Sequence, residues 1–80
     1  MAANPLKVIV LDENKEPISG VKLTAVEQNK SLFTDFDGES ELYNPNEVRL
    51  YKIDCVGYES GYIKVSRSEK SEIKIVLRKK

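Results

Sequence analysis

The stretch Thr34-Asp35-Phe36-Asp37-Gly38 is a short polar segment that ends in glycine and lies between two runs with strand character. An aspartate side chain often accepts hydrogen bonds from the backbone that follows it, and glycine readily adopts the positive φ of tight turns. We therefore predict a β-turn at residues 35–38, flanked by short strands at residues 31–34 and 39–43.

Alternating apolar and polar residues, which are typical of half-buried strands, predict further strands on both sides of this turn. These strands cover residues 6–12, 21–28, 48–56, 62–66 and 72–78. Turn-forming residues separate them: a loop at 12–17, a two-residue hairpin at Asn29-Lys30, a break at Asn44-Pro45-Asn46 and a polar turn at 68–71. No segment shows the period of an amphipathic helix. The sequence therefore predicts an all-β, seven-stranded antiparallel β-sandwich.

The chain of 80 residues is long enough for one small domain. We assign residues 6–78 to the β-sandwich, residues 1–5 to a disordered or added N-terminal segment, and residues 79–80 to a frayed C-terminus. Residues 1–5 show no signal-peptide pattern, and the longest apolar run, residues 8–11, is far shorter than a membrane span. We therefore expect no direct membrane insertion by this domain.

The charge composition argues against a nucleic-acid partner. The 13 basic residues are balanced by 13 acidic ones, so the net charge is zero. Proteins that bind nucleic acid need a basic surface that displaces counterions from phosphate, and membrane-surface segments need a similar excess of lysine and arginine. We expect neither kind of partner.

The residue types also argue against an enzyme. The chain contains no histidine and a single cysteine, Cys55. Without histidine it cannot form the Ser/His or Cys/His pairs of nucleophilic catalysis, nor most zinc sites. Cys55 falls within the predicted strand at 48–56, on its apolar face, so we interpret it as a buried and unreactive thiol.

Two aspartates in the central turn are the candidate metal ligands. Asp35 and Asp37 supply carboxylate oxygens, which calcium prefers. The EF-hand loop, however, needs a third oxygen ligand and a distant glutamate between flanking helices, and these are missing here. We therefore interpret the segment as a β-turn and expect no cofactor, with calcium as the alternative.

Three tyrosines are the candidate binding residues. Tyr43, Tyr58 and Tyr62 would suit the stacking of a sugar or a peptide if they shared one surface. The alternative for Tyr58 is structural: Gly57 permits a bend, and Tyr58 closes the end of the sandwich.

Three motifs in order resemble the carboxypeptidase regulatory-like domain, in the version abundant in Bacteroidetes surface proteins. They are Asp12-x-x-x-x-Pro17-Ile18-x-Gly20-Val21, then Thr34-Asp35-x-Asp37-Gly38, then Val56-Gly57-Tyr58. The resemblance implies a seven-stranded, Greek-key β-sandwich of transthyretin-like type. The chain departs from the family at Ser40, where an aromatic residue is usual, so we expect the strand at 39–43 to pack poorly unless Phe33 or Phe36 fills the space.

The resemblance also implies a role. Domains of this family usually serve as non-catalytic accessory modules, for example ahead of a TonB-dependent outer-membrane receptor. It implies location in the periplasm, the outer membrane or the cell surface, with other domains of the same polypeptide or a cell-envelope protein as partners. The alternative is a carbohydrate- or peptide-binding module that uses its surface tyrosines.

Overall fold

The computed structural model describes residues 5–43, 49–65 and 72–80 of the chain. These residues form seven strands: β1 (Pro5–Leu11), β2 (Lys22–Ala25), β3 (Lys30–Phe33), β4 (Glu39–Tyr43), β5 (Arg49–Asp54), β6 (Gly61–Val65) and β7 (Glu72–Val76). The seven predicted strands are thus confirmed. In the described part of the chain no helix has the length and apolar character that crossing a membrane requires. The predicted breaks at 44–46 and 68–71 and the N-terminal residues 1–4 lie outside the described residues.

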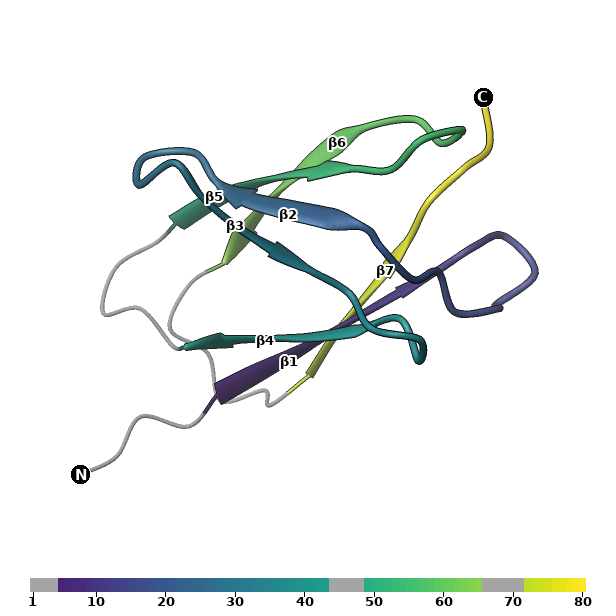
Figure 1. Ribbon diagram of the computed structural model, residues 1–80, viewed down its shortest axis with the longest axis horizontal. Helices are drawn as coiled ribbons and strands as arrows, with labels where there is room; N and C mark the ends of the chain where they lie inside the picture. The colour runs from purple at the N-terminus through teal and green to yellow at the C-terminus, as the bar shows by residue number, and fades with distance from the viewer. Residues whose placement is uncertain (1–4, 44–48, 66–71) are drawn as a thin grey trace.

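The strands form two sheets that face each other, as Figure 1 shows. One sheet has the order β4-β1-β7 and the other the order β3-β2-β5-β6. The side chains between the sheets are almost all aliphatic. The largest fully buried ones are Leu23, Leu42, Ile53, Val8, Val10, Val21 and Val65. Burial of each such side chain stabilises the fold by about 1.5–3 kcal/mol, so this aliphatic layer is the main source of stability. The prediction of an all-β, sandwich-like fold is confirmed, whereas its Greek-key, transthyretin-like connectivity stays a prediction.

The prediction that every strand pair is antiparallel is wrong for one pair. Strand β1 pairs in parallel with β7, with Val8 beside Ile73 and Val10 beside Ile75. Parallel neighbours need a long connection rather than a hairpin. Here the connection is nearly the whole chain, because β1 and β7 are its first and last strands.

The predicted two-residue hairpin at Asn29-Lys30 is also wrong in its position. Lys30 is already part of β3 and pairs with Ala25, so the loop contains residues 26–29. The backbone N–H groups of Gln28 and Asn29 both donate to the carbonyl oxygen of Ala25, at 3.2 and 2.8 Å. Asn29 has a φ of 53°, which asparagine tolerates better than most residues, so it closes the loop as the last residue rather than the first.

The C-terminal residues, which we expected to be frayed, pair with the segment before β6. Lys79 forms an isolated bridge with Tyr58, and the backbone N–H of Lys80 donates to the carbonyl oxygen of Gly57 at 3.1 Å. The bend predicted at Gly57 is present, with a φ of 87°. The end of the chain therefore lies against this bend.

Candidate functional site

The central turn has the geometry predicted from its sequence. One carboxylate oxygen of Asp35 accepts hydrogen bonds from the backbone N–H groups of Asp37 (2.9 Å) and Glu39 (3.0 Å). The backbone N–H of Gly38 donates to the carbonyl oxygen of Asp35 at 2.9 Å, and Gly38 has a φ of 71°. A side chain that bonds its own turn and a left-handed glycine together form the chain reversal that leads into β4.

The loop that follows β1 repeats this geometry. One carboxylate oxygen of Asp12 accepts from the N–H groups of Asn14 (2.8 Å) and Glu16 (2.9 Å), and the N–H of Lys15 donates to the Asp12 carbonyl at 2.9 Å. Lys15 has a φ of 64° and occupies the place that Gly38 takes in the central turn. Residues 12–16 and 35–39 both begin with aspartate and end with glutamate, and they make the same turn because the aspartate side chain bonds the backbone that follows it.

Gly38 also ties the central turn to the first sheet and to the loop before β2. A Cβ at this position would lie 2.6 Å from the carbonyl oxygen of Val10 and 3.0 Å from the Cβ of Pro17. Backbone at Gly38 can approach this closely only because the residue has no side chain. The turn therefore fixes where β4 starts relative to β1.

Both candidate calcium ligands, Asp35 and Asp37, lie in this turn, and the carboxylate of Asp35 already accepts hydrogen bonds from the backbone. Asp35 binds backbone N–H groups, as described above, while Asp37 is exposed. Within residues 5–43, 49–65 and 72–80, no group of three or more Asp, Glu, Cys or His residues is arranged to hold a metal ion. The expectation of no cofactor, with calcium at Asp35 and Asp37 as the alternative, stays an untested prediction.

The candidate tyrosines lie at different places. Tyr58 is half-buried, packs against the hydrophobic core and lines a pocket of about 410 Å³ together with Phe33. Tyr62 on β6 is 61% exposed and lines a different pocket, of about 300 Å³. The backbone of Tyr43 ends β4, and its side chain lies outside the described residues. The structure therefore does not place Tyr58 and Tyr62 in one pocket.

The environment of Cys55 differs from the predicted one. Cys55 lies just after β5 rather than within it, and its carbonyl oxygen accepts a hydrogen bond from the N–H of Tyr58 at 3.1 Å. The residue is half-buried and lines the same pocket as Tyr58. The prediction of a buried thiol is wrong in degree, because strand pairing ends at Asp54 and leaves Cys55 half-buried, although it still packs against the core.

Of the two alternatives at Ser40, the one in which Phe33 or Phe36 fills the space is wrong. Phe33 is 61% exposed and Phe36 is 93% exposed, because one lies on an edge strand and the other at the tip of the central turn. Neither aromatic side chain contributes to the buried core.

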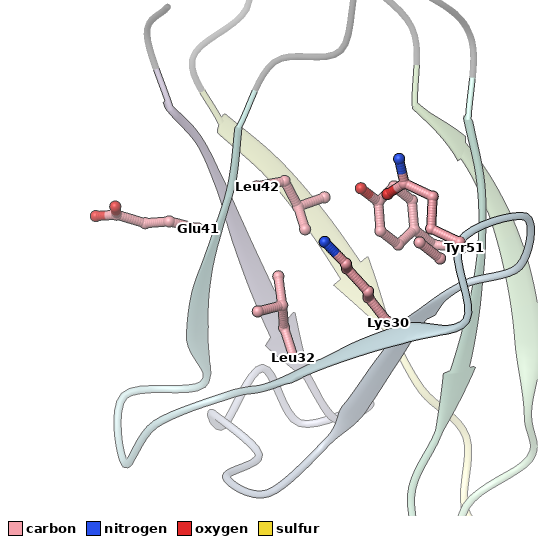
Figure 2. Close-up of a pocket in the computed structure, with 7 residues that line it drawn as sticks. Lys30, Leu32, Glu41, Leu42 and Tyr51 are labelled. Carbon is pink, nitrogen blue, oxygen red and sulfur yellow. The ribbon is translucent and has the colours of Figure 1, made fainter.

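The two sheets leave a pocket of about 340 Å³ beside their edge strands β3 and β4. Its walls are mostly apolar and include Leu32, Leu42 and Tyr51. Figure 2 shows Lys30 and Leu32 extending from β3 toward this opening, whereas Glu41 points away from it. Gln28 and Glu41 also line the pocket, which thus combines an apolar interior with a polar rim where Lys30 extends toward the opening.

From the sequence, the strands at residues 31–34 and 39–43 were predicted to be edge strands and the preferred docking surface, and β3 and β4 do lie at sheet edges. Neither Lys30 nor Leu32 was singled out. All four residues of β3 are exposed, which a strand at the centre of a sheet would not be. The signal is present in the sequence, since Leu32 and Phe33 are adjacent and must point to opposite faces. The sequence alone does not show that these two side chains are exposed, because their exposure depends on which strands lie beside β3.

The family comparison agrees with the motifs from which the sequence was interpreted. The model of the CarboxypepD_reg-like domain matches residues 8–80, which include all seven strands apart from the first residues of β1. No curated protein matches the chain. Because the family match covers more than half of the sequence, the chain belongs to the CarboxypepD_reg-like domain family.

Proposed function

We propose that this domain is a non-catalytic accessory and interaction module of a larger exported bacterial protein. The family match over residues 8–80 carries the proposal, since carboxypeptidase regulatory-like domains form a family of regulatory β-sandwich modules. The composition supports it, because the chain has no histidine with which to build a nucleophile–base pair. The exposed edge strand β3 gives such a module a surface for a partner.

A more specific form of the proposal places the domain at the N-terminal side of a TonB-dependent outer-membrane receptor. Its partners would then be other domains of the same polypeptide or a cell-envelope protein, in the periplasm or at the cell surface. We also propose that its two sheets have the Greek-key, transthyretin-like connectivity of this family. The support for these statements is the resemblance of the three turn motifs around Pro17, Gly38 and Gly57.

The intact size and cell fraction of the native protein test this proposal. An antibody raised against the domain would be used on fractionated cells of the source organism. We expect a species much larger than the 9.1 kDa of this chain, in the envelope fraction. A small species in the soluble fraction would contradict the accessory role.

A second candidate function is a carbohydrate- or peptide-binding module, as the candidate tyrosines suggested. One observation favours it: Tyr58 and the exposed ring of Phe33 line the same pocket of about 410 Å³. Aromatic rings in a pocket that Lys22, Asp54 and Lys80 also line suit the stacking of a sugar. Titration of the domain with oligosaccharides, comparing Tyr58→Ala with Tyr62→Ala, tests it. Binding that is lost only in Tyr58→Ala would support this function.

A further inference from the structure

Strand β3 is the edge of the four-stranded sheet and is exposed on both of its faces. We propose that its free edge binds an extended peptide as an added antiparallel strand, with a carboxylate of the peptide opposite Lys30 and an aliphatic side chain opposite Leu32. This inference rests on the proposed role as an interaction module and names the site and the chemistry of the partner.

The backbone groups that such a strand needs can be assigned from the ladder between β2 and β3. The N–H of Thr34 donates to the carbonyl oxygen of Val21 at 3.0 Å, so the backbone of Thr34 points toward the β2 side. In an antiparallel pair, alternate residues point toward the partner and away from it. Ser31 and Phe33 therefore direct their N–H and C=O groups outward, where an added strand would bond them.

The edge of the other sheet next to this opening is less accessible. On β4 the carbonyl oxygen of Glu39 accepts from the N–H of Asp35 at 2.9 Å, and the N–H of Glu39 donates to the Asp35 carboxylate. The central turn thus occupies both backbone groups of Glu39. An added strand would find the first outward residue of β4 already bonded.

The other two edge strands are β6 and β7, and the segments next to them are hydrogen-bonded to each other. There the N–H of Glu59 donates to the carbonyl oxygen of Arg78 at 2.8 Å, next to the bridge between Tyr58 and Lys79. This pairing links the segment before β6 to the segment after β7. Strand β3 is therefore the edge that we select.

The side chains of β3 determine what the partner must carry. Lys30 and Leu32 both line the pocket of about 340 Å³ described above, and Phe33 lines the pocket on the other face. In the described part of the chain, the ion pairs join Lys7 to Glu39 and Lys52 to Asp54, so Lys30 takes part in neither. A carboxylate is the complementary group for this ammonium at the mouth of an apolar pocket.

These positions define a short pattern for the partner. In an antiparallel pair, residues directly opposite share a face, so the peptide residues follow the order Phe33, Leu32, Ser31 and Lys30 from its N-terminus. An apolar residue would come first, then an aliphatic one that enters the pocket. A serine or threonine would follow, and then an aspartate or glutamate.

A synthetic peptide with the core valine-leucine-threonine-glutamate, capped at both ends, tests this inference by NMR titration of the folded domain. We expect the largest shift changes at the backbone amides of Ser31 and Phe33. N-methylation of the peptide's threonine, which faces Ser31, is expected to abolish binding, because it removes a bond to the edge. N-methylation of the leucine, whose N–H points away from β3, is the matched control and should leave binding intact.

Charge reversal tests the pairing at Lys30. Lys30→Glu should weaken binding about tenfold, and a peptide with lysine in place of glutamate should recover that loss. Lys64→Glu, at an exposed position on β6, is the control and should change the affinity less than about twofold. The recovery by the lysine peptide shows that the variant is folded.

Three results would overturn the inference: no binding of the peptide, shift changes on β4 or β6 instead of β3, or equal loss of binding with both N-methylated peptides. The proposed function is tested separately by the size and fraction of the native protein. If the native protein is large and found in the envelope fraction but the domain does not bind the peptide, the accessory role is retained and only the proposed peptide site is ruled out.

Discussion

The hydroxyl group of Thr34 donates a hydrogen bond to the carbonyl oxygen of Ile18 at a distance of 2.8 Å. The same hydroxyl oxygen accepts a bond from the backbone N–H of Val21 at 2.9 Å, and Thr34 is only 5% exposed. One buried side chain therefore satisfies two backbone groups of the segment that leads into β2. This bond joins two of the three motifs by which the family was recognised.

Replacement of this hydroxyl group should strongly destabilise the domain. Thr34→Val keeps the shape of the side chain but leaves the Ile18 carbonyl and the Val21 N–H without a partner inside the protein. We expect a loss of about 3 kcal/mol in the free energy of unfolding, measured by urea denaturation. Thr34→Ser keeps the hydroxyl and should cost less than about 1.5 kcal/mol. Equal losses in the two variants would mean that the methyl group, not the hydrogen bonds, matters.

Alanine at Gly38 should be far more costly than alanine at Gly20. The two glycines have similar φ values, 71° and 74°, so both substitutions pay the same backbone cost of about 1–2 kcal/mol. Only at Gly38 would the new Cβ clash with backbone, 2.6 Å from the Val10 oxygen, while nothing lies within 4 Å at Gly20. Thermal denaturation of Gly38→Ala should therefore show an unfolded or severely destabilised protein. A similar melting temperature for the two variants would contradict the close approach.

Glycine at position 15 should stabilise the domain. Lys15 has a φ of 64° in a turn whose counterpart uses Gly38, and a left-handed conformation costs a residue with a side chain about 1–2 kcal/mol. Part of this gain is lost to the greater freedom of glycine in the unfolded chain, so we expect a net gain of about 0.5 kcal/mol for Lys15→Gly. Asn29→Gly is the comparison, because asparagine tolerates its φ of 53° and the gain there should be smaller. Destabilisation by Lys15→Gly would show that the lysine side chain has another role.

Calcium should leave the melting temperature unchanged, and so should a chelator. The Asp35 carboxylate already accepts two backbone N–H groups, and a ligand stabilises a protein only if it binds the folded state. Differential scanning fluorimetry with millimolar calcium and with EDTA measures this. If calcium raised the melting temperature and the Asp37→Asn substitution abolished that rise, the turn would be a calcium site.

Much of this fold follows from local sequence patterns. Alternation places Leu6, Val8 and Val10 on one face of β1, and the structure buries all three. The turn at 35–38 and the bend at Gly57 were also predictable. Each depends on residues a few positions apart, whose spacing the sequence shows directly.

Only the tertiary structure decided the rest, because the rest depends on contacts between distant residues. The parallel pairing of β1 with β7 joins the two ends of the chain, which no local pattern reports. Lys30 and Leu32 line an open pocket because β3 lies at the edge of its sheet. Cys55 is half-buried because strand pairing ends at Asp54. By itself the sequence therefore determined which residues form strands and turns and indicated the strands at 31–34 and 39–43 as edges. Side-chain burial, and the choice of β3 over β4 as the docking edge, came from the way those strands are packed.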